Sequence, residues 1–97
     1  MRLAILGAGA WGTALAVAYA EEHGVTLWAR DAAQREALRT TRRSRYLAEV
    51  VLPGTVEVAE DPVAAIRGAD VAMIATPTAG LRYAAGLVHH AAVRRPV

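Results

Sequence analysis

The 97-residue sequence contains no cysteine, no lysine and no phenylalanine. Without cysteine the chain has no disulfide framework, no thiol nucleophile and no cysteine-based zinc site. The histidines, His23, His89 and His90, are too scattered to indicate a metal site. All 11 basic residues are arginines and the net charge is only +2, a mild balance that does not argue for a nucleic-acid partner.

Long apolar runs are also missing. None approaches the roughly 20 residues that span a bilayer, and the N-terminus shows no signal-peptide pattern. We therefore expect a soluble, cytoplasmic protein without a membrane partner. A chain of 97 residues forms one domain at most, enough for half of a nucleotide-binding domain. Its 23 alanines and 5 % aromatic residues suit helices packed closely on a sheet.

The most informative stretch lies near the N-terminus, where an apolar run leads into spaced glycines. Residues 3–6 are short, apolar and bounded by glycine, which predicts a buried parallel strand. Gly7, Gly9 and Gly12 complete the pattern G-x-G-x-x-G, and a helix is expected over residues 13–22. Strand, glycine turn and helix in this order are the context in which the pattern binds a dinucleotide.

Each glycine has its own physical role in this pattern. Gly7 allows the tight turn off the strand, Gly9 leaves the backbone open to a pyrophosphate, and Gly12 lets the helix pack closely. The helix start then offers N–H groups and its positive dipole end to the diphosphate. A packing turn that holds no phosphate is the alternative. Trp11 either packs beneath this turn or forms a wall of the cofactor site.

The end of the second expected strand, over residues 25–29, bears on the choice of cofactor. A carboxylate there holds the ribose 2′-OH of NAD, whereas an arginine accommodates the 2′-phosphate of NADP. Arg30 stands at this point, which favours NADPH without excluding NADH. Asp31 is either a 2′-OH acceptor or, as we favour, the N-cap of the next helix, with Gln34 completing a capping box. Gly24 is expected to end the first helix in a left-handed conformation.

The remaining segments alternate between helix and strand patterns. We expect a helix over residues 32–40, a turn at Pro53 and Gly54, a strand over 55–59, a helix from Asp61 to Gly68, a strand over 71–75 and a helix over 78–90. This order predicts an α/β fold: a Rossmann-type, doubly wound parallel sheet in the order 3-2-1-4, incomplete, with about four strands and flanking helices. The arginine-rich segment 39–45 is interpreted as a solvated loop, with attraction of a phosphate as the alternative.

In a sheet of this order, ligands bind above the carboxyl ends of the first and fourth strands. Thr76 and Pro77 end the fourth strand, so they either contact the nicotinamide half of the cofactor or simply start a helix. Asp70 precedes that strand at its amino end and is expected to be a turn residue. Residues 94–97 look like the approach to another strand. We therefore expect residues 1–97 to be an incomplete dinucleotide-binding domain that lacks a helical substrate and catalytic domain.

Two linked segments carry a family resemblance. Residues 9–16 (GAWGTALA) and 27–30 (LWAR), together with 45–47, 52–53 and 70–77, resemble the N-terminal part of bacterial NAD(P)-dependent glycerol-3-phosphate dehydrogenase. The resemblance covers nearly the whole chain. It implies reversible hydride transfer between NADPH or NADH and dihydroxyacetone phosphate, which gives sn-glycerol 3-phosphate for phospholipid synthesis. It also allows a homodimer of the full-length enzyme.

Carried over residue by residue, the resemblance implies cofactor contacts at Ala10, Trp11, Arg30 and Tyr46. The family usually has serine where this chain has Ala10, so a hydroxyl is lost while the backbone N–H stays. Near Tyr46, Arg43 and Ala48 replace the usual asparagine and proline. The family's catalytic lysines lie in later segments, so we assign no catalytic residue here. We expect the full-length protein to be an enzyme and these 97 residues alone to be inactive.

Two other functions stay open. Another Rossmann dehydrogenase, acting on a hydroxy acid or a sugar acid, would share the glycine turn and the arginine, although the pair Trp11 and Trp28 favours the first interpretation. A nucleotide-sensing module that binds without chemistry fits the lysine-free composition. The unfinished strand at the end of the sequence argues against such a module.

Overall fold

The computed structural model describes residues 1–44 and 47–75. Its elements are β1 (Arg2–Leu6), α1 (Ala10–Tyr19), β2 (Gly24–Trp28), α2 (Ala32–Thr41), β3 (Arg43–Ser44), β4 (Leu47–Val51), β5 (Glu57–Val58), α3 (Pro62–Arg67) and β6 (Val71–Ile74). The helix expected over residues 78–90 and the strand expected from 94 lie outside the described residues.

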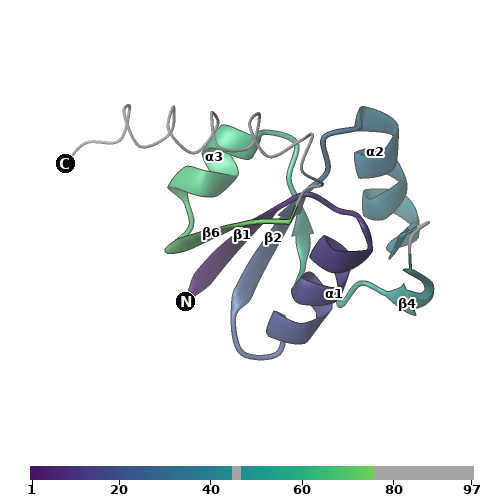
Figure 1. The fold of residues 1–97 in the computed structure, drawn as a ribbon, viewed down its shortest axis with the longest axis horizontal. Helices are drawn as coiled ribbons and strands as arrows, with labels where there is room; N and C mark the ends of the chain where they lie inside the picture. The colour runs from purple at the N-terminus through teal and green to yellow at the C-terminus, as the bar shows by residue number, and fades with distance from the viewer. Residues whose placement is uncertain (45–46, 76–97) are drawn as a thin grey trace.

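Four strands form a parallel sheet in the order β5-β2-β1-β6 (Figure 1). This is the predicted order of third, second, first and fourth strand, and it confirms the α/β fold class. Leu6 pairs with Trp28 on one side and with Ile74 on the other, so three strands end at the same edge. The ends of the sheet are unequal, because β5 has 2 residues and β6 has 4.

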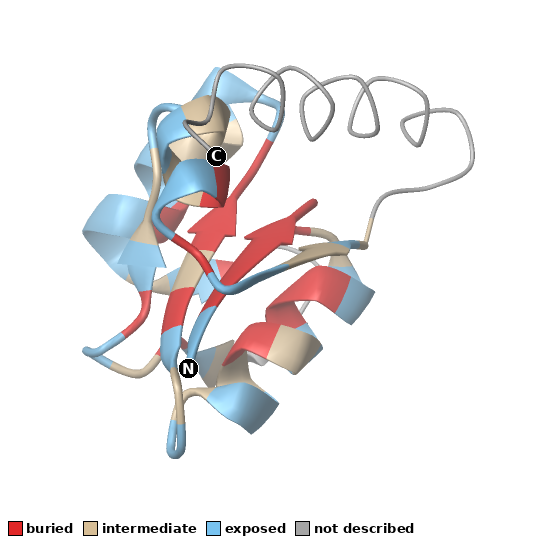
Figure 2. Cartoon of the chain, turned by 90° about the vertical axis from the view of Figure 1, so that its left-hand side faces the viewer, coloured by how far each residue is buried: buried red, intermediate tan, exposed pale blue. Residues whose placement is uncertain are grey.

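Both faces of the sheet are covered, which explains why residues 3–6 of β1 are all apolar and why Val25, Leu27 and Trp28 of β2 are buried. On one face Leu3, Ile5 and Leu27 pack with α1 and α2. On the other face Leu6 and Trp28 pack with α3. Buried residues are accordingly concentrated in the central strands β1 and β2 and on the inner sides of the helices (Figure 2).

The placement of α1 and α3 on opposite faces follows from the order of the strands. The connection through α1 leads from β1 to β2, whereas the connection through α3 leads from β5 back across the sheet to β6. Two right-handed crossovers that run in opposite directions put their helices on opposite faces. The connections that follow β1 and β5 at the carboxyl edge of the sheet therefore leave in opposite directions.

Local signals at the helix starts are confirmed. The side chain of Asp31 accepts a hydrogen bond from the N–H of Gln34 (3.2 Å), as expected of an N-cap. Asp61 accepts one from the N–H of Val63 (3.0 Å), and proline follows at the first helical position. Asp70 lies at the amino end of β6, where its carboxylate accepts from the N–H of Arg2 (2.7 Å).

The end of α1 differs from the prediction. The helix stops at Tyr19 rather than near residue 22, and Gly24 is the first residue of β2 rather than a left-handed cap. The reason is that the backbone N–H groups of Glu22 and His23 both donate to the carbonyl oxygen of Tyr19 (3.3 and 3.0 Å). These bonds close the helix in a tight turn, so no left-handed residue is needed.

The described part of the arginine-rich segment, residues 39–44, forms the end of α2 and the strand β3 rather than a loop, although Arg39 and Arg43 are exposed. Arg42 ends α2 in the left-handed conformation (φ 60°), and its Nη2 donates to the carbonyl oxygens of Pro53 (2.5 Å) and Val56 (2.7 Å). Arg43 then opens a short antiparallel pair of β3 and β4. Pro53 begins the predicted turn, which the N–H of Val56 closes on its carbonyl (3.0 Å). The third strand of the parallel sheet is shorter than predicted.

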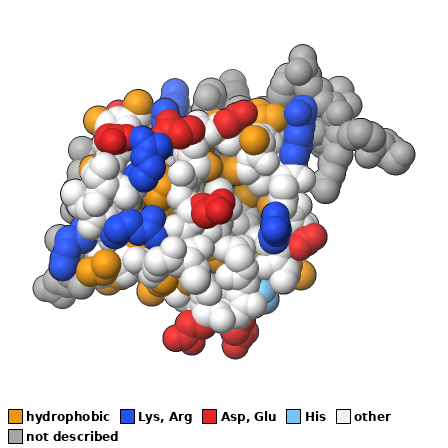
Figure 3. Space-filling model, turned by 180° about the vertical axis from the view of Figure 1, so that it is seen from behind, with side chains coloured by type: hydrophobic (Ala, Val, Ile, Leu, Met, Phe, Trp, Pro, Cys, Tyr) orange, Lys and Arg blue, Asp and Glu red, His pale blue; other side chains and the backbone are white. Residues whose placement is uncertain are grey.

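Charges of both signs are interspersed over the face of the molecule seen in Figure 3. Within the part of the chain that the structure describes, no helix combines the length and the apolar character that crossing a bilayer requires.

Replacing Arg42 by Met should lower the free energy of unfolding by about 1–3 kcal/mol, because two partly buried carbonyls lose their donor. Methionine keeps the apolar part of the side chain and the cost of the left-handed backbone, so the substitution tests the contribution of the guanidinium alone. The matched control is Arg67→Met at the exposed end of α3, which should cost less than about 1 kcal/mol. Urea unfolding followed by circular dichroism measures both, and equal losses would contradict this role for Arg42.

Candidate functional site

The glycine turn leaves the sheet at the centre of its carboxyl edge. Gly7 follows β1 with a positive φ of 113°, a conformation that favours glycine, and its N–H donates to the carbonyl of Trp28 (2.8 Å). On the other side the N–H of Ala75 donates to the carbonyl of Leu6 (2.8 Å). The ends of β2 and β6 therefore flank the turn.

Gly12 and Gly9 differ in what surrounds them. A Cβ at Gly12 would lie 1.8 Å from the carbonyl oxygen of Gly7, so any side chain there would displace the backbone. Among the residues that the structure describes, a Cβ at Gly9 would meet no atom within 4 Å, and the backbone of Gly9 (φ −72°, ψ −166°) is open to other residues. The fold therefore requires glycine at position 12 but not at position 9.

The N-terminus of α1 opens at this turn. Gly9 is the N-cap and supplies no side-chain hydrogen bond, and the first bond within the helix runs from the N–H of Thr13 to the carbonyl of Gly9 (3.0 Å). The N–H groups of residues 10–12 precede that bond and have no carbonyl in their own helix to bind. Together with the positive end of the helix dipole, they form an arrangement that can hold an anion.

Trp11 lies in the first turn of α1 with 68 % of its surface exposed. The interpretation that it packs beneath the glycine turn is therefore wrong. Ala10 beside it is also exposed. Both residues start a helix whose buried positions are Gly12, Thr13 and Ala16, so the first turn projects beyond the core.

The carbonyl oxygen of Ala8, inside the turn, accepts two side-chain hydrogen bonds. One comes from the hydroxyl of Thr13 (3.3 Å) and the other from Nε2 of Gln34 (2.7 Å), which lies on α2. The expected capping box is thus only half present, because the side chain of Gln34 reaches the glycine turn instead of the backbone of Asp31. Nothing in the sequence spacing indicates this contact between residues 26 positions apart.

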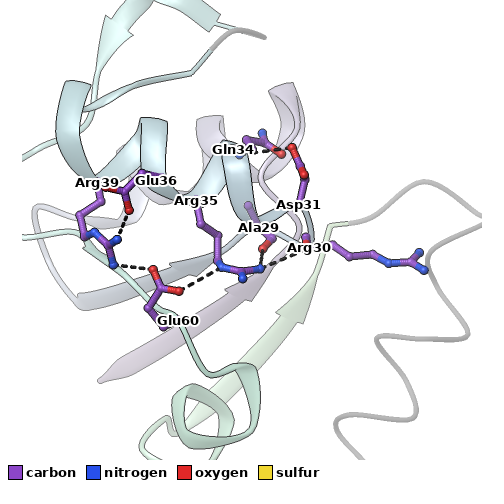
Figure 4. A network of polar contacts seen from close by, with 8 residues as sticks. All are labelled: Ala29, Arg30, Asp31, Gln34, Arg35, Glu36, Arg39 and Glu60. Atoms are coloured by element: carbon purple, nitrogen blue, oxygen red, sulfur yellow. Dashed lines mark hydrogen bonds and ion pairs between the residues drawn. The ribbon is translucent and has the colours of Figure 1, made fainter.

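The backbone after β2 is held by a second residue of α2 (Figure 4). Nη1 of Arg35 donates to the carbonyl oxygens of Ala29 (2.8 Å) and Arg30 (3.0 Å). Nε of Arg35 lies 3.5 Å from a carboxylate oxygen of Glu60. Arg30 itself is exposed, and its side chain extends away from Arg35 and Glu60.

Glu60 also pairs with Arg39, which in turn pairs with Glu36 on the same helix. The hydrogen bond and charge of Glu36, followed by the charge of Glu60, raise the pKa of Arg39 above its usual value. The charges of Arg35 and Arg39 on α2 are therefore balanced by the carboxylates of Glu36, on the same helix, and Glu60, which precedes α3 (Figure 4).

The structure brings the glycine turn and Arg30 to one edge of the sheet, as predicted, because Gly7 and Ala29 follow paired residues of β1 and β2. Tyr46, Thr76 and Pro77 lie outside the described residues. A cavity of about 460 Å³ lies elsewhere, between α3 and the sheet, and its lining includes none of the predicted cofactor-binding residues that the structure describes. Its lining includes Arg2, Gly24 and Gly68, at the amino ends of the strands.

The chain matches a family model described as NAD-dependent glycerol-3-phosphate dehydrogenase N-terminus over residues 2–96. It is 49 % identical over 87 residues to glycerol-3-phosphate dehydrogenase (NAD(P)+) of Aromatoleum aromaticum, covering 89 % of this chain and 26 % of the relative. Against the enzyme of the same name from Thermus thermophilus it is 51 % identical over 84 residues, which are 84 % of this chain and 26 % of the relative.

A crystal structure of glycerol-3-phosphate dehydrogenase from Coxiella burnetii has the same fold, with a TM-score of 0.75 at 33 % identity, covering 79 % of this chain and 24 % of that one. The chain spans about a quarter of the length of the curated relatives it matches.

Replacing Gly12 by Ala should lower the free energy of unfolding by at least about 2 kcal/mol, because the added methyl group meets a backbone carbonyl that cannot move independently of β1. Gly9→Ala is the matched control in the same turn and should change it by less than about 1 kcal/mol. Thermal and urea unfolding distinguish the two. Similar losses for both variants would show that the turn is not packed as described.

Proposed function

The chain belongs to the NAD-dependent glycerol-3-phosphate dehydrogenase family, and on that basis we propose that it is the part of such an enzyme that binds the dinucleotide. The observation that carries this proposal is the difference between Gly9 and Gly12. The protein's own packing explains glycine at position 12, whereas at position 9 no atom of residues 1–44 or 47–75 occupies the space beside the backbone. A group outside the protein that must approach this backbone closely gives a reason for glycine there.

The diphosphate is that group. Its negative charge suits the N–H groups at the start of α1, and the missing Cβ of Gly9 lets its oxygens reach them. Gly7 and Gly12 contribute by shaping the turn, and Ala10 offers a backbone N–H without the hydroxyl usual in the family. The exposed indole of Trp11 forms a wall of the same site.

Arg30 discriminates between NADP and NAD at the adenosine end of the cofactor. Its guanidinium follows β2 at the edge where an arginine accommodates the 2′-phosphate of NADP, so NADPH is favoured while NADH still binds. The carboxylate of Asp31 caps α2, which supports the N-cap interpretation of Asp31 over the 2′-OH acceptor. Tyr46 and Pro77 complete the proposed set of cofactor contacts, on the basis of the family resemblance and of the strand order.

The complete enzyme, in this proposal, interconverts dihydroxyacetone phosphate and sn-glycerol 3-phosphate in the cytoplasm, as a homodimer. Bound NADPH or NADH supplies the hydride for this reaction. The residues of this chain bind and orient the dinucleotide. Residues outside this part bind the phosphate of the substrate and donate the proton. The names of the relatives that match the chain support this assignment.

Titration with NADPH and NADH should show saturable binding of both, with NADPH bound more tightly. Gly9→Ala should weaken both by about 10-fold or more while changing the unfolding free energy by less than about 1 kcal/mol, because its methyl group occupies the path of the diphosphate. Arg30→Ala should weaken NADPH by about 10-fold and leave NADH nearly unchanged. Quenching of tryptophan fluorescence or calorimetry measures this, and the absence of saturable binding would overturn the proposal.

Mixed with NADPH and dihydroxyacetone phosphate, the 97-residue chain should give no turnover above background. Reduction of a ketone needs a proton donor at the carbonyl oxygen, and the chain has no lysine for that role. Loss of absorbance at 340 nm, the band of reduced nicotinamide, is the assay, with a full-length relative as the positive control. Measurable turnover would show that a residue of this chain acts as the donor.

A further inference from the structure

Two adjacent residues at the start of α2, Gln34 and Arg35, contact the two loops that the proposed function assigns to the cofactor. We propose that they are positioning residues, which set the placement of the glycine turn and of the Arg30 backbone relative to each other. The inference rests on the proposed function and concerns residues that do not themselves touch the cofactor. It makes α2 a bridge between the diphosphate end and the ribose end of the site.

Gln34 fixes the orientation of a peptide group in the turn. Its Nε2 and the hydroxyl of Thr13 both donate to the carbonyl oxygen of Ala8, and Ala8 is only 4 % exposed. The carbonyl of Ala8 and the N–H of Gly9 belong to one planar trans peptide, so they point in opposite directions. Holding the carbonyl towards Gln34 and Thr13 therefore turns the N–H of Gly9 away from them. The donor direction of the turn depends on these two side chains.

Arg35 acts on the other loop. β2 ends at Trp28, so the carbonyls of Ala29 and Arg30 lie beyond the strand, and Nη1 of Arg35 donates to both of them. The side chain of Arg35 is 16 % exposed and its charge is balanced by Glu60. The two peptide groups on either side of the Arg30 Cα are thus fixed, and with them the point from which the Arg30 side chain extends.

Helix geometry explains why these two adjacent residues contact different loops. Successive residues of an α-helix are about 100° apart around the axis, so neighbours face different elements. Gln34 faces the turn after β1 and Arg35 faces the loop after β2. The diphosphate is common to both cofactors and the 2′-phosphate is not. Loss of the Gln34 contact should therefore weaken both cofactors alike, whereas loss of the Arg35 contact should change the preference between them.

The charge of Arg35 could affect NADPH without any positioning, and the chain offers a matched control for this. Arg39 lies on the same helix and pairs with the same Glu60, but its hydrogen bonds go to carboxylates and not to the backbone after β2. Arg39→Met removes an equal charge and leaves the contacts of Arg35 in place. Arg35→Lys keeps the charge and loses the planar guanidinium.

The experiment on Gln34 compares Gln34→Ala, Gln34→Glu and the control Thr40→Val, whose hydroxyl bonds only within α2. Gln34→Ala should weaken NADPH and NADH by the same factor, about 3–10-fold. Without cofactor, the amide hydrogens of residues 9–12 should exchange faster. Gln34→Glu should bind weakly at pH 7 and more tightly towards pH 5, because only the protonated acid donates to the Ala8 carbonyl. Gln34→Ala should show no such recovery.

The experiment on Arg35 compares the ratio of the NADPH and NADH dissociation constants in Arg35→Met, Arg35→Lys and Arg39→Met. We expect Arg35→Met to lower the preference for NADPH by about 3-fold or more, Arg35→Lys to do so by a smaller factor, and Arg39→Met to leave it within about 2-fold of the unsubstituted chain. Circular dichroism of each variant verifies that it is folded. A variant that is not folded is replaced by a more conservative substitution at the same position.

Three results overturn the inference: wild-type affinities and exchange rates in Gln34→Ala, no pH-dependent recovery in Gln34→Glu, or equal effects of Arg35→Met and Arg39→Met on the ratio. If the unsubstituted chain binds neither cofactor, the proposed function fails. The exchange measurement, made without cofactor, then still decides whether Gln34 holds the turn.

Discussion

The structure depends on one close approach, that of Gly12 to the carbonyl of Gly7. Because no side chain stands between them, α1 begins directly above the end of β1. This contact places the first turn of the helix, with its N–H groups, at the centre of the carboxyl edge of the sheet. The register then brings the ends of β2 and β6 to either side, so the same edge collects the turn, Arg30 and Ala75.

A second layer of contacts holds this edge in shape. Gln34 and Arg35 satisfy carbonyls that the strands leave beyond their ends, while Glu60 offsets the charge of Arg35. Polar groups at the end of a strand need such partners when they are partly buried. Here the side-chain donors are Gln34 and Arg35 of α2 together with Thr13 of α1, and Glu60 precedes the N-cap of α3. Proposed binding residues and supporting residues are therefore distinct sets that meet at backbone carbonyls.

Features set by neighbouring residues could be predicted from the sequence. The glycine pattern predicted the turn, the caps Asp31 and Asp61 predicted where helices begin, and the alternation of elements predicted the sheet order. Features set by distant partners could not. Arg42 has a left-handed backbone and donates from its side chain to carbonyls at positions 53 and 56, and Gln34 binds a carbonyl 26 positions away. Neither spacing nor propensity contains that information, and Gly24 illustrates how a strong local signal misleads.

The two edge strands of the sheet differ in length, so its two sides differ as sites for the addition of a further strand. β5 offers a ladder only 2 residues long, whereas β6 presents 4, with the apolar side chains of Val71 and Ile74 exposed at 40 % and 37 %. An extended edge of this kind is a template for further backbone pairing, and a short one is not. Among the described residues, the β6 side of the sheet therefore offers the longer ladder for the addition of a further strand.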